Sequence, residues 1–186
     1  MIHHEREDGL VVKAQLLIFL VAFISPIIAS ALLSKELGDM VFKMVDMLFI
    51  CGTILLAIKL AREGWDMAAA GFTILGIGWG VLFASLDFQQ LKIDGEVRTS
   101  AAYFFIPCMI LIAYYRPFPW WIKGLTLWCF IPFSVALLLQ KTGLHNEERV
   151  STWLLVGFSS FHTASILWAI FFYRQWRKQK KDSHPK

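Results

Sequence analysis

The sequence lacks the short motifs that usually mark an enzyme or a nucleotide-binding protein. It contains no P-loop, no dinucleotide-binding glycine pattern and no cluster of metal-ligand residues. Its three cysteines, Cys51, Cys108 and Cys129, all fall in apolar runs, without a CxxC neighbour or a histidine at ligand spacing. Isolated cysteines in apolar runs usually behave as small buried apolar residues. No cofactor and no metal are therefore expected, no catalytic residue is assigned, and an enzyme is the least favoured class of function.

The sequence also lacks linkers, low-complexity segments and any stretch that could form a soluble domain. The polar ends, residues 1–12 and 174–186, are too short to fold alone. The connections between the apolar runs are short, which favours antiparallel neighbouring helices. We therefore expect residues 1–186 to form a single domain.

Long apolar runs are what the chain does have. Hydrophobic residues make up 57% of it, and the mean hydropathy is +0.57. A hydrocarbon core of about 30 Å needs roughly 20 helical residues. The runs are continuous, unlike the alternating segments of a membrane β-barrel. The sequence thus predicts an all-α polytopic membrane protein, a bundle of six transmembrane helices with short loops, at approximately 15–34, 41–61, 67–88, 99–115, 119–140 and 150–173.

Two of these predicted spans are less typical than the other four. Residues 99–115 are at the short end for a spanning helix. The run 41–61 carries charges at Lys43, Asp46 and Lys59. The expected solvent for the whole bundle is a lipid bilayer, in an inner or plasma membrane.

The distribution of basic residues predicts that both termini are cytoplasmic. With the N-terminus inside, 12 of the 18 lysines and arginines lie on the cytoplasmic side and 6 on the outer side. The inner set is Arg6, Lys13, Lys59, Arg62, Arg116, Lys123, Arg174, Arg177, Lys178, Lys180, Lys181 and Lys186. The outer set is Lys35, Lys43, Lys92, Arg98, Lys141 and Arg149. The preference depends on the C-terminal tail, because the two sides otherwise tie.

The basic tail has two interpretations that are compatible with each other. It is first a topology signal of the usual kind. It could also contact anionic lipid, since each basic residue near a membrane surface contributes about 1 kcal/mol. No nucleic-acid partner is expected, because no aromatic platform or binding fold accompanies the charge.

Small residues in the third run predict close helix packing. Gly76, Gly80 and Ala84 recur every four residues and so share one stripe, with Gly71 and Gly78 adding to the small character. Small side chains let helix backbones approach each other in lipid. The alternative is a hinge or a solute-lining face. The partner helix could belong to the same chain, to a homo-oligomer or to another membrane protein.

Three prolines fall within predicted spans and predict helix kinks: Pro26, Pro107 and Pro132. Each proline removes a backbone hydrogen bond and frees a carbonyl about one turn earlier. A sharper interpretation is that broken helices line an ion or solute site. Pro26 and Pro107 occupy corresponding places if the six helices form two inverted halves, but Pro132 has no counterpart.

Ionisable groups within the predicted spans are the best pointers to function, because they are costly to insert and tend to face the bundle interior. His162 lies near the middle of 150–173, and Ser159 and Thr163 extend a polar face around it. Asp46 lies near the outer end of its run, close to Lys43. These residues could form a solute or proton pathway. Equally, His162 could join two helices, and Asp46 could be a boundary residue paired with Lys43.

Two hypotheses of function follow. The first is a small transporter or channel-like protein that uses His162 and the kinked helices. The second is a non-catalytic accessory or structural subunit that packs against membrane partners through Gly76, Gly80 and Ala84. A water-accessible cavity at His162 would favour the first. A solid core with an exposed stripe of small residues would favour the second.

Overall fold

The chain folds into helices joined by short connections. A computed structural model describes residues 2–84, 95–142 and 147–182, and within these ranges every regular element is α-helical. The last four residues of the expected span 67–88, residues 85–88, lie outside the described residues. The helices are α1 (Ile2–Leu32), α2 (Lys35–Arg62), α3 (Asp66–Ala84), α4 (Gly95–Ala113), α5 (Trp120–Trp128), α6 (Phe130–Lys141) and α7 (Glu147–Asp182).

Tight connections make α1, α2 and α3 antiparallel neighbours. Between α2 and α3 the chain reverses at Gly64, whose φ of 77° suits a residue without a Cβ. The Trp65 amide donates to the Leu60 carbonyl at 2.9 Å, and the Gly64 amide donates to the Ala61 carbonyl at 3.1 Å. This pair of bonds is the Schellman arrangement, which satisfies the last carbonyls of α2 and ends the helix.

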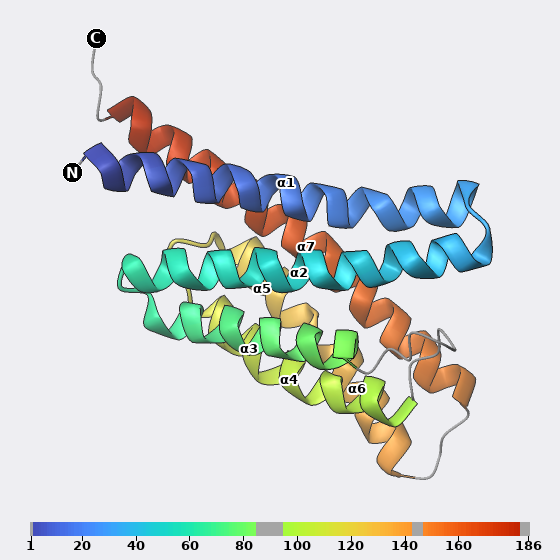
Figure 1. Cartoon of the computed structure of the whole chain (residues 1–186). Helices are drawn as coiled ribbons and strands as arrows, with labels where there is room; N and C mark the ends of the chain where they lie inside the picture. Colours follow the sequence, from blue (N-terminus) through green and yellow to red (C-terminus); the bar gives the residue numbers. More distant parts are fainter. Residues whose placement is uncertain (1, 85–94, 143–146, 183–186) are drawn as a thin grey trace.

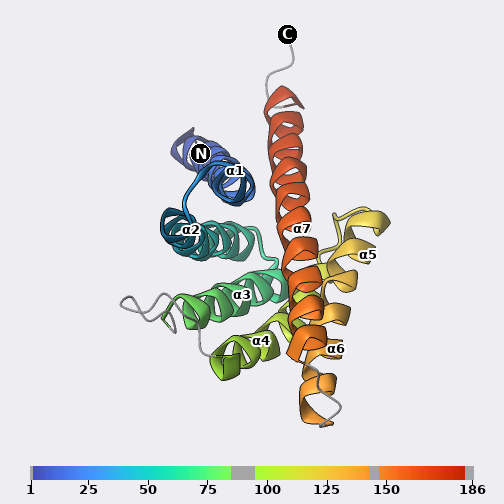
Figure 2. The same cartoon turned by 90° about the vertical axis from the view of Figure 1, so that its right-hand side faces the viewer.

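The helices pack in chain order, and the last helix then closes the bundle. α2 packs between α1 and α3, and α3 packs between α2 and α4. α7 returns across the molecule and contacts α1, α5 and α6. Figure 1 shows α7 crossing α1 and α2 obliquely. Figure 2 shows α7 along its length, with α1 and α2 viewed close to their axes.

Of the three prolines, only Pro132 coincides with an interrupted helix. α5 ends at Trp128 and α6 begins at Phe130, with Cys129 between them. The ring of a proline clashes with the carbonyl four residues earlier, which here belongs to Trp128. Pro26 and Pro107 instead lie inside the continuous helices α1 and α4.

Within the described ranges, five helical segments are long and apolar enough to cross a membrane. They are Gly9–Ala29, Met40–Arg62, Asp66–Ala84, Trp120–Lys141, which joins α5 to α6, and Glu148–Lys181. The apolar part of α4, Ser100–Ala113, is shorter than the roughly 20 residues that a bilayer requires. The prediction of helices in all six runs agrees with the structure, while the sixth crossing stays a prediction.

The long helices continue into the polar ends of the chain. α1 begins at Ile2 and α7 continues to Asp182. At 36 residues and 1.5 Å per residue, α7 is about 54 Å long and exceeds the hydrocarbon thickness. The start of α1 and the end of α7 lie at the same end of the molecule (Figure 1). A pair of cytoplasmic termini requires this arrangement.

Candidate functional site

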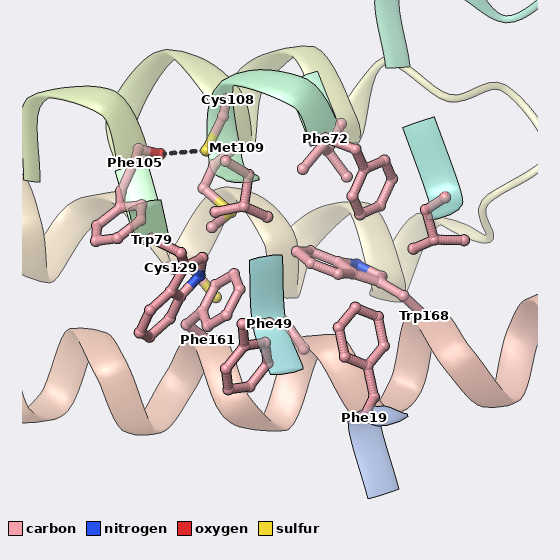
Figure 3. Close-up of a cluster of buried hydrophobic side chains, with 14 of the residues drawn as sticks. Phe19, Phe49, Phe72, Trp79, Phe105, Cys108, Met109, Cys129, Phe161 and Trp168 are labelled. Atoms are coloured by element: carbon pink, nitrogen blue, oxygen red, sulfur yellow. Dashed lines mark hydrogen bonds between the residues drawn. The ribbon is translucent and has the colours of Figure 1, made fainter. Parts of the chain in front are cut away.

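The centre of the bundle is filled by aromatic rings. Phe49 of α2 stacks on Trp79 of α3, with ring centroids 4.8 Å apart, and Phe161 of α7 lies 5.3 Å from both. Phe105 of α4 lies 5.5 Å from Trp79. Figure 3 shows these four rings converging from four helices. We call these residues, Phe49, Trp79, Phe105 and Phe161, the central aromatic cluster.

Glycines provide space for rings in and around this cluster. A Cβ on Gly78 would lie 2.9 Å from the ring of Phe105, and one on Gly52 would lie 2.5 Å from the ring of Phe19. These distances are below van der Waals contact, so each ring occupies the volume that a side chain would need. The close fit leaves this part of the core densely packed.

His162 joins the cluster from α7. Its imidazole meets the ring of Phe49 edge to face, with centroids 4.8 Å apart, and lies 6.2 Å from Trp79. The side chain is half-buried. The structure therefore directs His162 towards α2 and α3.

The two residues predicted to extend the polar face of His162 do not point into the bundle with it. Ser159 and Thr163 are both exposed, and the Thr163 hydroxyl donates to the Ser159 carbonyl at 3.0 Å. Ser165, one turn further on, is buried and donates to the carbonyls of Phe161 and His162. Hydroxyls that bond their own helix do not offer a solute a row of free polar groups.

Asp46 lies one turn before Phe49 on α2 and is half-buried. Lys43, one turn earlier still, is buried. Both residues have interaction partners. Asp46 and His162 are thus both adjacent to Phe49, Asp46 along the helix and His162 through ring contact.

The small residues of α3 divide between different faces. A Cβ on Gly76 would lie 3.0 Å from the Thr53 hydroxyl of α2, whereas one on Gly80 would meet nothing within 4 Å among the described atoms. Ala84 is exposed. The closest approach is made by Gly71, where a Cβ would lie 2.9 Å from the backbone nitrogen of Ile112 in α4. Of the predicted stripe, Gly76 therefore lies against α2, whereas a side chain added at Gly80 would meet no atom of the described residues.

Two buried polar side chains have no hydrogen-bond partner within the described chain. Both amide atoms of Gln15 in α1 are unpaired, and so is the indole nitrogen of Trp79. An unpaired buried polar group costs about 1–3 kcal/mol. The sequence does not indicate a buried Gln15, because this residue stands at the boundary of the first predicted span, 15–34. The apolar segment of α1 in fact begins at Gly9.

Among the described residues, a buried side-chain hydrogen bond joins α5 to α7. The Trp168 indole of α7 donates to the Thr126 hydroxyl of α5 at 3.0 Å, and both residues are fully buried. The same hydroxyl donates to the Ile122 carbonyl at 2.8 Å. The bond fixes α7 against the helix segment that precedes the break at Cys129.

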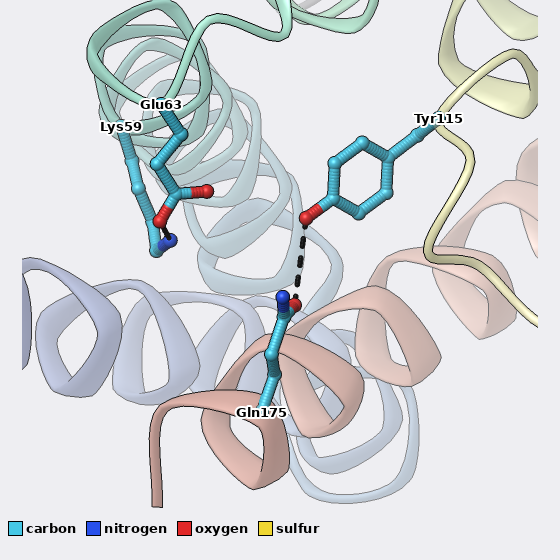
Figure 4. Close-up of polar contacts among 4 residues, drawn as sticks. All are labelled: Lys59, Glu63, Tyr115 and Gln175. Carbon is cyan, nitrogen blue, oxygen red and sulfur yellow. Dashed lines mark hydrogen bonds and ion pairs between the residues drawn. The ribbon is translucent and has the colours of Figure 1, made fainter. Parts of the chain in front are cut away.

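A second group of polar side chains lies at the C-terminal end of α2. Lys59 pairs with Glu63, and its ammonium lies 5.8 Å from the centroid of the Phe172 ring. The Tyr115 hydroxyl, in the connection after α4, donates to the Gln175 side-chain oxygen of α7 at 3.4 Å. Figure 4 shows the two pairs, which come from α2, the connection after α4, and α7.

This polar group explains how a lysine is buried near the end of a predicted span. Lys59 is only 6% exposed. Its carboxylate partner and the aromatic face offset the loss of hydration. We assign this group a structural role, because each polar atom named in it has a partner.

Neither the donor groups nor the comparisons point to a known chemistry. Among the described residues, no three histidine, cysteine, aspartate or glutamate side chains are grouped closely enough to hold a metal ion. No family model, curated protein or solved structure matches this chain. A function must therefore be argued from the packing and the polar groups of the chain itself.

Proposed function

We propose that this chain is a non-catalytic accessory or structural subunit of a membrane assembly, located in an inner or plasma membrane with both termini in the cytoplasm. It would pack through the outer face of α3 against a helix of a second copy or of another membrane protein. The observation that carries the proposal is the contrast between the filled aromatic core and the small residues left on the outside of α3.

The outer face of α3 is unlike a face made for lipid. At helical spacing it presents the small or polar residues Ala70, Thr73, Gly80 and Ala84 and only two large apolar residues, Met67 and Ile77; all but the half-buried Gly80 are exposed. The exposed face of α1 carries large apolar residues instead: Leu10, Leu17, Leu20, Val21, Ile24 and Ile28. Large side chains suit lipid, while small ones permit close contact between helix backbones. The contrast supports a helix partner for α3.

The test compares two glycines whose surroundings are open. A Cβ on Gly80 or on Gly124 of α5 would meet nothing within 4 Å among the described atoms. Gly80→Leu should therefore leave the monomer folded but weaken its assembly, while Gly124→Leu should affect neither. Chemical cross-linking in native membranes, followed by mass determination, measures assembly. The proposal is wrong if wild-type protein forms no cross-linked complex or if both variants behave alike.

A small proton or solute transporter is the second candidate. Two observations support it: His162 points inward, and the indole nitrogen of Trp79, in the central aromatic cluster, has no hydrogen-bond partner among the described residues. Purified protein in liposomes containing a pH-sensitive dye would report proton flux. Flux that is lost in His162→Ala, with thermal stability retained, would favour this candidate over the accessory role.

A further inference from the structure

The C-terminal turns of α7 carry a basic stripe along one side of the helix. Arg174, Arg177, Lys178 and Lys181 follow i, i+3, i+4, i+7 spacing and therefore share a face. All four side chains are exposed. We call these four residues the basic stripe.

Packing against α1 fixes the direction of the stripe. Trp176 covers Gly9 of α1, where an added Cβ would lie 2.8 Å from the indole. The ammonium groups of Lys13 and Lys180 lie 5.2 and 5.8 Å from the centroid of this ring. Trp176 is on the opposite side of α7 from Arg174, since two residues turn a helix by about 200°. The stripe thus faces away from α1.

If α1 and α2 lie along the membrane normal, the inclination of α7 brings this side close to a membrane surface. α7 crosses α1 and α2 obliquely and ends beside the start of α1 (Figure 1). The side turned away from α1 is then the one nearer the surrounding headgroups. The stripe extends about 10 Å along the axis, and a headgroup layer is roughly 5–8 Å deep. Long arginine and lysine side chains can cover the difference.

We propose that the basic stripe binds the headgroups of anionic phospholipids in the leaflet next to the chain termini. This interaction goes beyond the proposed packing role, and it does not depend on it. The occupant follows from charge complementarity: four exposed positive charges adjoin a surface that can carry negative charge. Lys180 is outside the stripe, because it lies over Trp176 on the side facing α1.

Lys178 and Lys180 provide a matched pair for the test, since each substitution by glutamine removes one positive charge. Purified protein in detergent is titrated with short-chain phosphatidylglycerol or phosphatidylcholine, and bound lipid is counted by native mass spectrometry. Lys178→Gln should weaken phosphatidylglycerol binding roughly fivefold, the factor that about 1 kcal/mol represents. Lys180→Gln should change it little. Replacing all four stripe residues by glutamine should abolish the preference for phosphatidylglycerol.

Several outcomes would overturn the proposal. Equal losses in Lys178→Gln and Lys180→Gln would mean that net charge, and not the stripe, governs binding. Equal retention of both lipids by the wild type would leave the stripe available for an acidic protein partner. Displacement of the lipid by inorganic phosphate at the same concentration would identify a phosphate site. Circular dichroism of each variant establishes that the helices are intact, and measurement in detergent makes the result independent of membrane orientation.

Discussion

At the scale of single residues, several hydroxyl groups in this bundle bond to their own helix. Ser25, Thr53, Thr73 and Ser165 each donate to a carbonyl three or four residues earlier. Such bonds satisfy a hydroxyl inside an apolar environment without linking one helix to another. Specific attachment between helices therefore depends on the few polar groups that reach across.

The bond between Trp168 and Thr126 is the clearest such attachment and can be tested. Thr126→Val keeps the shape of the side chain but leaves the buried indole N–H of Trp168 without its acceptor. We expect the free energy of unfolding to fall by about 1–2 kcal/mol, measured by titration with SDS. Thr73→Val is the control, because the exposed Thr73 hydroxyl bonds only to the Ala69 carbonyl among the contacts described. Equal effects of the two changes would contradict the cross-helix role.

Substitution of Gln15 is expected to raise the stability of the protein. Since neither atom of its buried amide is paired, Gln15→Met should remove a polar penalty at nearly constant volume. The expected gain is about 1–3 kcal/mol in the free energy of unfolding, measured by the same titration. Gln140→Met, at an exposed position, controls for the general effect of methionine. A loss of stability in Gln15→Met would show that the native amide makes a hydrogen bond in the membrane.

The polar face of α7 shows what helical periodicity can and cannot predict about side-chain direction. Ser159 and Thr163 are one turn apart on α7, and both are exposed. His162 is about 60° away from Ser159 around the helix axis, and it is directed towards Phe49 and Trp79. Periodicity defines which residues share a face. It does not define where the edge of the buried sector falls, because that depends on how the neighbouring helices pack.

At the scale of helices, α3 presents glycines to more than one neighbour. Gly71 and Gly78 face α4, Gly76 faces α2, and Gly80 meets neither. Spacing every four residues identified only one of these faces. The Gly71 and Gly78 pair is seven residues apart, two turns on the same side, and the close approach to α4 depends on it.

A pair of alanine substitutions separates these faces. In Gly78→Ala, the new Cβ would lie 2.9 Å from the Phe105 ring and 3.1 Å from the Phe104 Cβ. We expect a loss of about 1–3 kcal/mol from overpacking. Gly80→Ala adds a methyl group that would meet no atom of the described residues within 4 Å. It also gains helix propensity, so stability should stay constant or rise by up to about 1 kcal/mol. Thermal unfolding in detergent measures both. A destabilised Gly80→Ala would indicate a partner already bound at that face.

At the scale of the whole molecule, the apolar runs predicted the helical architecture well. Run length and composition are local properties, and they located a helix in each of the six predicted segments. The oblique course of α7 and the contact of its end with the start of α1 were not predicted. Both depend on side chains far apart in sequence, such as Gly9 and Trp176.

Topology is the remaining expectation at this scale. If both termini are cytoplasmic, a reporter fused after Lys186 should be active in the cytoplasm, while one inserted within 89–98 should report the opposite side. The basis is the excess of basic residues in the tail. Replacing Arg177, Lys178, Lys180, Lys181 and Lys186 by glutamine should produce mixed orientations. An external signal from the fusion after Lys186 would refute the charge argument.

The contact between Gly9 and Trp176 has a consequence for biogenesis. These residues are 167 positions apart, so α1 completes its packing only after almost the entire chain has been synthesised. At about 5–20 residues per second, the delay is on the order of ten to thirty seconds. Until α7 is synthesised, α1 and α2 must reside in the membrane without it, and Trp176 cannot yet cover Gly9.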